Sequence, residues 1–181
     1  MRGRTAELTP GLPAPDESVR RHFSRTAGRF PTGVTVLTTV DGGGELHGMT
    51  VNAFATASLD PLLILVALGN GSRTGQRLIA NGRFAVSVLG ADQEGVARWF
   101  ADRSRPVGSG SFREIGWFPA PETGCPVVTG AAAYFDCSVH STSPAGDHTV
   151  VIGAVHAFDA LSAQPPLLFS HSRFTATPTA D

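Results

Sequence analysis

The sequence is poor in charged residues, and it contains no long apolar run. Charged residues make up 16% of the 181 residues, and the formal net charge is −1. This balance excludes the basic surface of a protein that binds nucleic acid or anionic membranes. No apolar stretch approaches the roughly 20 residues that span a bilayer. We therefore predict a protein with neither a nucleic-acid partner nor a membrane partner.

Cysteine is also scarce, since only Cys125 and Cys137 occur. Neither belongs to a C-x-x-C pair or to a zinc-like spacing, which excludes a disulfide framework and a zinc ribbon. No cluster of His, Asp and Glu has metal-ligand spacing either, so we predict no metal site. Both thiols are typical of small core residues in a reducing compartment. The basic start, residues 1–4, is followed by no apolar signal segment, and we expect a cytoplasmic protein.

Other recognisable motifs and repeats are missing as well. No G-x-G-x-x-G follows a strand and opens a helix, which argues against a Rossmann dinucleotide site. No serine has the context of a nucleophile elbow, and there is no internal repeat. With 41% hydrophobic residues, the length fits one domain with a proper core. We expect a flexible arm over residues 1–17, one folded domain over 18–174 and a flexible tail over 175–181.

The patterns that are present predict six or seven strands and two or three short helices. Helices are expected over residues 17–27, 73–80 and 93–101, with Asp16, Ser72 and Asp92 as their N-caps. Strands are expected over residues 34–40, 45–51, 62–68, 84–89, 131–141, 149–158 and 167–169. Residues 102–121 are expected to be a loop region with one short turn of helix, and residues 142–147 to be a loop. Hairpin-like turns join most strands, which favours a largely antiparallel barrel with helical decoration over a doubly wound parallel sheet.

Small and hydroxyl side chains interrupt the apolar pattern between Gly48 and Leu63. Thr50, Asn52 and Ser58 alternate with apolar residues, which indicates backbone that passes close to a flat, hydrogen-bonding ligand such as a flavin. The alternative is that these are polar residues at strand ends that bond to their own turns.

Two further stretches are candidates for ligand binding. Ser72, Arg73 and Thr74 open a helix, where N–H groups and a positive charge would converge on a phosphate; a plain N-cap with a solvated arginine is the alternative. His148 stands beside Asp147 in a glycine-containing loop between two long strands, a favourable place for a functional histidine. A solvent-exposed histidine without a role is the alternative. His47, His140 and His156 fall within strands and are expected to be packing or surface residues.

Six short motifs follow one another in order: residues 30–36, 48–54, 57–62, 82–89, 124–131 and 146–149. In this order and spacing the chain resembles the flavin reductase-like family of FMN-binding split barrels, the reductase components of two-component monooxygenases. The resemblance covers residues 23–174. It has two departures: Ala53 stands where many members carry serine, and Asp60-Pro61-Leu62 has one proline where a pair is common.

The resemblance implies an antiparallel split β-barrel with the activity of an NAD(P)H:flavin oxidoreductase. Such an enzyme transfers a hydride from NADH or NADPH to FMN or FAD, and it supplies reduced flavin to a partner flavin-dependent monooxygenase. A homodimer whose pocket is completed at the subunit interface is also implied. Two alternatives remain open: a flavin-binding carrier or sensor, and a split-barrel flavoenzyme that acts directly on an organic substrate.

The resemblance also assigns roles to particular residues. The predicted cofactor-binding residues are Thr50, Val51, Asn52, Ala53, Ala57 and Ser58 for the flavin, Ser72, Arg73 and Thr74 for its phosphate, Asp147 and His148 for the nicotinamide, and His171, Arg173 and Phe174 in the closing segment. His148 is the one predicted catalytic residue. We expect it to place the nicotinamide rather than to transfer a proton, because the cofactors themselves carry the hydride.

Overall fold

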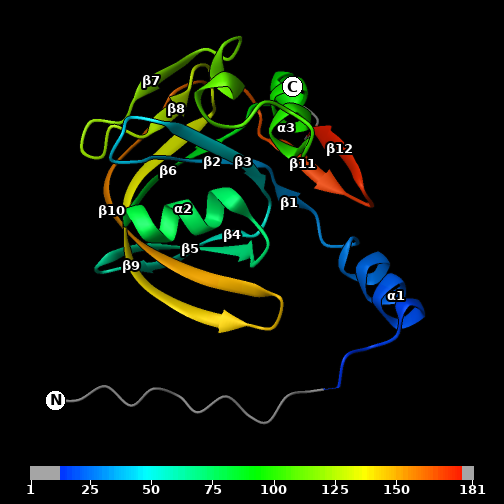
Figure 1. Ribbon diagram of the computed structural model, residues 1–181. Coiled ribbons are helices and arrows are strands. Elements are labelled where there is room, and N and C mark those ends of the chain that lie inside the picture. The colour runs from blue at the N-terminus through cyan, green and yellow to red at the C-terminus, as the bar shows by residue number, and fades with distance from the viewer. Residues whose placement is uncertain (1–12, 177–181) are drawn as a thin grey trace, which may run out of the picture.

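Strands rich in β-branched and aliphatic residues make up most of the structure. The computed structural model describes residues 13–176, and seven of its strands hydrogen-bond in the order β3-β2-β6-β9-β10-β5-β4. Every pairing in this sheet is antiparallel, and the sheet curls into an open barrel (Figure 1). The predicted mainly-β, antiparallel barrel with short helices is confirmed.

The bounds of the elements show which segments build each sheet. The main sheet contains β2 (Thr35–Val40), β3 (Leu46–Val51), β4 (Phe54–Leu59), β5 (Leu62–Gly69), β6 (Arg83–Val88), β9 (Ala133–Ala145) and β10 (His148–Ala160). Two small sheets contain β1 (Thr32–Gly33), β11 (Leu167–Ser170) and β12 (Arg173–Ala176), and β7 (Trp117–Pro119) with β8 (Pro126–Val128). The helices are α1 (Glu17–Ala27), α2 (Arg73–Asn81) and α3 (Glu94–Ala101), with 3-10 turns η1 (Ala91–Gln93) and η2 (Gly108–Phe112).

Local signals place α1 and α2 where the sequence predicts them. The Asp16 carboxylate accepts the N–H of Val19 at 2.9 Å, and the Ser72 hydroxyl accepts the N–H of Gly75 at 3.0 Å. Helix α2 ends at Gly82, whose φ of 69° is a left-handed conformation that glycine adopts without steric cost. Both predicted N-caps and the predicted C-cap are confirmed.

Helix α3 begins later than predicted, and Asp92 is not its N-cap. The turn η1 precedes the helix, and the Gln93 N–H donates to the Gly90 carbonyl at 2.9 Å. The Gln93 side chain in turn accepts the Gly90 N–H at 3.1 Å. These reciprocal bonds close a tighter turn before the helix, and they leave Asp92 exposed inside that turn.

Several strands were not expected from the sequence. Strand β4 pairs with β5 at one edge of the main sheet, although its small and polar residues gave no strand signal. The predicted loop over 142–147 is wrong, because β9 and β10 extend into a hairpin with Gly146 and Asp147 in the turn. In the loop region over 102–121 the expected short helical turn is η2, whereas strand β7 was not expected. Thr175 and Ala176, assigned to the tail, pair in β12, whereas residues 1–12 and 177–181 lie outside the described residues.

Two apolar clusters hold the helices against the barrel. Leu78 of α2 is fully buried in the barrel core with Leu37, Val66 and Phe84. A second cluster joins α3 and η2 to the outer side of the sheet. It includes Val36, Leu46, Phe100 and Phe112. These two clusters fix α2 and the α3–η2 segment on either side of β3.

Helix α1 differs from the other helices because it stands apart from the barrel (Figure 1). None of its residues is buried. Among residues 13–176, no helix is both long enough and apolar enough to cross a membrane.

Candidate functional site

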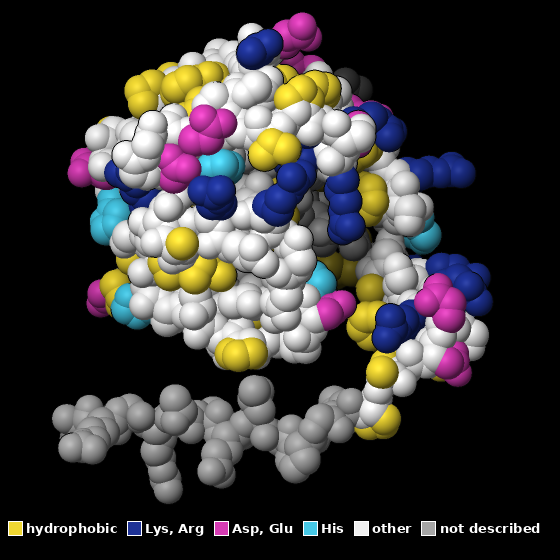
Figure 2. All heavy atoms as spheres, in the orientation of Figure 1, with side chains coloured by type: hydrophobic (Ala, Val, Ile, Leu, Met, Phe, Trp, Pro, Cys, Tyr) yellow, Lys and Arg dark blue, Asp and Glu magenta, His cyan; other side chains and the backbone are white. Residues whose placement is uncertain are grey.

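A cavity of about 440 Å³ lies where β3, the N-terminus of α2 and the segment after α3 meet. Such a volume falls within the range of about 300–1,000 Å³ that is typical of small-molecule sites. Thr50, Ser72, Arg73, Thr74 and His148 all line it, so the structure brings together five of the predicted site residues. Figure 2 shows basic side chains gathered on this face of the molecule, between α2 and α3.

Strand β3 turns toward the cavity a backbone edge that no other strand of the sheet pairs with. It is the last strand of the sheet, with β2 as its only neighbour there. The Leu46 N–H donates to the Ser109 hydroxyl at 3.0 Å, and the Gly48 carbonyl accepts the Thr74 hydroxyl at 3.2 Å. Because every second residue of an antiparallel edge strand points its N–H and C=O away from the partner strand, Thr50 presents its backbone on the same side. The Thr50 hydroxyl itself donates to the Ala97 carbonyl at 2.7 Å.

The N-terminus of α2 is suited to hold an anion. Ser72 caps the Gly75 N–H, whereas the N–H groups of Arg73 and Thr74 belong to the first turn and have no intrahelical acceptor. The helix dipole adds partial positive charge at the same place, and the exposed Arg73 side chain adds a full charge.

Arg105 is a pocket residue that the sequence reasoning missed. Its guanidinium donates to the Gly48 carbonyl and, at 2.5 Å, to the Asp102 carbonyl, and it lies 5.6 Å from the centre of the Phe100 ring. Its Nε is buried without a partner. Burial lowers the pKa of Arg105, and the positive charge of Arg73 lowers this pKa further. The signal in the sequence was the basic stretch Arg103-Ser104-Arg105, within a segment predicted to be an irregular loop.

His148 is held at the rim of the cavity by the β9–β10 turn. Its Nδ1 lies 2.7 Å from the Asp147 carboxylate, and the hydrogen bond and charge of His148 lower the pKa of Asp147. Asn70 ties this turn to the loop before α2. The Asn70 N–H donates to the Asp147 carbonyl at 2.9 Å, and the Asn70 side chain accepts the Thr149 hydroxyl at 2.9 Å. The side chain of His148 is 48% exposed, and therefore it is accessible to a ligand.

Comparison with known proteins matches residues 27–178 to the flavin reductase like domain. This match covers most of the chain. The chain belongs to the flavin reductase-like family. The predicted family, the split-barrel fold and the flavin reductase class of enzyme are thereby confirmed.

Two named relatives align with most of the chain. An NADH-dependent FAD reductase of Streptomyces globisporus is 42% identical over 175 residues, which are 96% of this chain and 95% of that protein. The reductase subunit HsaB of a flavin-dependent monooxygenase from Mycobacterium tuberculosis is 38% identical over 157 residues, 86% of this chain and 81% of the relative. This chain is also similar to a solved structure, that of Streptomyces globisporus C-1027 NADH:FAD oxidoreductase SgcE6 in complex with NAD and FAD fragments. The TM-score is 0.84 at 40% identity, and the match covers 94% of this chain and 100% of the SgcE6 chain.

The cavity of this flavin reductase-like chain fits the ligands that its family implies. The edge of β3 that no strand covers offers the Thr50 backbone to a flavin ring, and the α2 N-terminus offers an anion site for its phosphate. The unpartnered Nε of Arg105 leaves a buried donor that a ligand acceptor would satisfy.

Other predicted flavin contacts do not line this cavity. Val51 is buried in the barrel core, and Asn52 and Ala53 are exposed in the short link between β3 and β4. Ala57 and Ser58 lie on the edge strand β4, where the Ser58 hydroxyl accepts the Asp60 N–H at 3.2 Å. Their roles toward the flavin stay predictions.

The predicted closing segment lies in the β11–β12 hairpin. Phe174 packs on Phe169 with ring centres 5.2 Å apart, and the Arg98 guanidinium lies 4.9 Å from the Phe174 ring. His171 lines a second cavity, which faces α1, and Arg173 is exposed. The contribution of these three predicted residues to the flavin site also stays a prediction.

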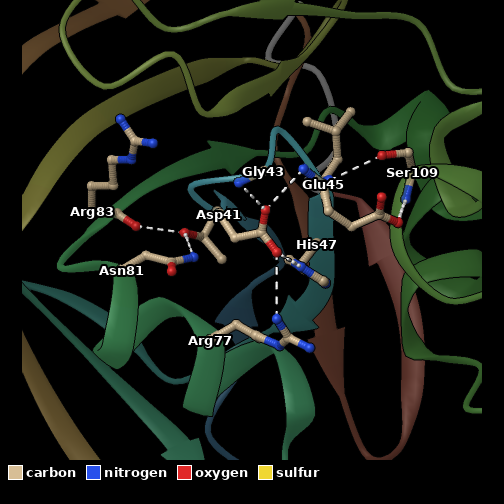
Figure 3. Close-up of polar contacts among 10 residues, drawn as sticks. Asp41, Gly43, Glu45, His47, Arg77, Asn81, Arg83 and Ser109 are labelled. Atoms are coloured by element: carbon tan, nitrogen blue, oxygen red, sulfur yellow. Dashed lines mark hydrogen bonds and ion pairs between the residues drawn. The ribbon is translucent and has the colours of Figure 1, made fainter.

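His47 has a larger part in the cavity than the sequence indicated. It is buried, it lines the cavity, and its Nε2 lies 3.4 Å from Asp41. Figure 3 shows the Asp41 carboxylate between the backbone N–H groups of Gly43 and Glu45 on one side and the His47 and Arg77 side chains on the other. This cluster fastens the β2–β3 turn to α2, and it thereby fixes one wall of the cavity.

Proposed function

We propose that the chain is an NADH-dependent flavin reductase that accepts FAD or FMN and supplies reduced flavin to a separate flavin-dependent monooxygenase. The observation that carries this proposal is the convergence, in one cavity, of a free strand edge, an anion-binding helix N-terminus with Arg73, and His148. The names of the reductase relatives support NADH and FAD, and that of the HsaB subunit supports an oxygenase partner.

The residues of the chain bind and orient. Arg73 and the first-turn N–H groups of α2 hold the flavin phosphate, and the backbone of Thr50 faces the flavin ring. His148, steadied by Asp147, positions the nicotinamide at the rim. When both are bound, the nicotinamide supplies the hydride and the flavin accepts it, so placement and exclusion of water are the tasks left to the protein.

Turnover of nicotinamide tests this proposal. Purified protein is mixed with NADH and excess FAD or FMN, and the nicotinamide absorbance is followed, with NADPH in a parallel assay. We expect many turnovers per protein, with flavin released on desalting, because a flavin that is a substrate must leave the site. A protein that retains its flavin through desalting and oxidises no nicotinamide would instead be a carrier or sensor.

A homodimer is part of the proposal, and the exposed face of α1 supports it. Val19 and Phe23 lie one turn apart on this helix and are 51% and 73% exposed, and Phe30 just after it is 75% exposed. An 11-residue helix that buries nothing is marginal by itself in water, so a second copy of the chain is proposed to cover this face.

Sedimentation velocity tests the dimer. Phe23→Asp places a charge on the apolar face, and it should shift the protein toward the monomer. Arg21→Ala changes the polar face of the same helix, where Arg21 pairs with Glu17 at 3.5 Å, and serves as the matched control. Identical sedimentation of Phe23→Asp and the unmodified chain would contradict this interface. Cytoplasmic residence stays part of the proposal, consistent with two free, buried cysteines.

A further inference from the structure

Three arginines lie around the cavity. Arg73, Arg103 and Arg105 all line it. Among the residues that the structure describes, the ion pairs of arginine involve only Arg21, Arg77 and Arg98. The Asp102 carboxylate offsets part of the charge of Arg105, but within residues 13–176 none of the three arginines forms an ion pair, so the cavity keeps an excess of positive charge.

Arg105 is fixed in a position that suits an anionic ligand. Its guanidinium is held by the Gly48 and Asp102 carbonyls, and its buried Nε has no acceptor. Arg73 is close enough for its charge to lower the pKa of Arg105, because like charges repel. A bound anion between the two arginines would relieve this repulsion and satisfy the free donor.

The three arginines carry more positive charge than one bound phosphate group would neutralise. The α2 N-terminus and Arg73 supply N–H donors and one positive charge, which we assign to the phosphate that FMN carries, whereas Arg103 and Arg105 come from a different element, the segment after α3. We propose that Arg103 and Arg105 form a second phosphate subsite, which binds the distal phosphate of a nucleoside diphosphate. This subsite would favour ligands that contain ADP, namely FAD or NADH, over FMN; it rests on the proposed assignment of Arg73 to the first phosphate.

Calorimetric titration with ADP and AMP tests the subsite without any turnover. The variants are Arg103→Ala and, as a matched control, Arg113→Ala, an exposed arginine that does not line the cavity. Because Arg103 is exposed, its removal should leave the thermal midpoint unchanged. We expect the unmodified chain to bind ADP about tenfold more tightly than AMP, a difference of ~1.4 kcal/mol, and Arg103→Ala to abolish that preference.

A second arm identifies which nucleotide uses the subsite. If FAD is the ligand, Arg103→Ala should weaken FAD binding about tenfold and leave FMN binding unchanged. If NADH is the ligand, NADH binding alone should weaken. Absence of an ADP preference in the unmodified chain, or equal effects of Arg103→Ala on ADP and AMP, would overturn the proposal. A chain that shows the ADP preference yet oxidises no NADH would keep the subsite and lose the reductase.

Discussion

Gly48 stands where the backbone of β3 meets two aromatic rings of the α3–η2 segment. A Cβ atom at this position would lie 2.6 Å from Cε1 of Phe100 and 3.0 Å from Cζ of Phe112. Both rings are buried, with exposed fractions of 1% and 3%, so a ring that gives way must press on packed neighbours or, for Phe100, enter the ligand cavity that it lines. Gly48→Ala therefore forces a shift of the rings or of β3. Overpacking of this kind costs about 2 kcal/mol of folding free energy.

The same substitution should also disturb ligand binding. The Gly48 carbonyl accepts hydrogen bonds from Thr74 and Arg105, and the Arg105 guanidinium lies over the Phe100 ring. A displaced ring or strand moves these groups relative to the cavity. We expect the thermal midpoint to fall by roughly 4–8 °C, and the flavin dissociation constant to rise in parallel. Calorimetry and flavin fluorescence titration measure the two effects.

Gly95→Ala provides the matched control. Gly95 is an exposed position within α3, and a Cβ atom there meets nothing within 4 Å. Gly95 lies in the first turn of α3, where alanine gains less than the ~0.5–1 kcal/mol by which it is favoured over glycine in a helix interior, so this variant should be slightly more stable than the unmodified chain. An unchanged midpoint for Gly48→Ala, with the expected gain for Gly95→Ala, would refute the reasoning from steric contact.

Three further predictions concern the nicotinamide, pH and the thiols. His148→Ala should raise the KM for NADH several-fold and leave flavin affinity near wild type. His140 is an exposed histidine of β9, and His140→Ala should change neither quantity. Lost flavin binding with unchanged NADH kinetics in His148→Ala would count against the assigned role. Hydrogen bonds to the Asp41 carboxylate, the largest from the Glu45 N–H, lower the pKa of Asp41. The ionised carboxylate therefore stabilises the fold above about pH 4, and this stabilisation is lost as the pH falls through the lowered pKa. The urea midpoints of the unmodified chain and of Asp41→Asn should therefore differ at neutral pH and converge in acid; a constant difference would contradict this linkage. Burial raises the pKa of both Cys125 and Cys137, so a thiol reagent at neutral pH should label them only in denaturant, and rapid labelling of the native protein would show the burial to be wrong.

Elements with short-range signals could be predicted from the sequence. The caps at Asp16, Ser72 and Gly82 each depend on contacts within four residues, so the bounds of α1 and α2 followed to within one residue. Strands β2, β3, β5 and β6 could be predicted because each contains a run of β-branched or apolar residues. Strand β4 escaped prediction because its small and polar residues form a strand only through pairing with β5.

The candidate site divides in the same way. Ser72, Arg73 and Thr74 were predicted correctly as the start of a helix, and the structure places them with Thr50 and His148 in one cavity. Arg105 was missed because its partner, the Gly48 carbonyl, is 57 residues away in the chain. His47 was assigned to packing or to the surface because a lone histidine in a strand gives no sign of a cavity beside it.

The sequence by itself determined the family, the antiparallel barrel and the helix N-terminus around Arg73, since these follow from local pattern and from the order of motifs. Only the tertiary structure decided that the segment after α3 folds back onto β3 and brings Arg103 and Arg105 opposite Arg73. The physical reason is that this approach is set by packing of Phe100 and Phe112 against the bare Cα of Gly48. Such packing depends on residues distant in sequence, and no local pattern encodes it.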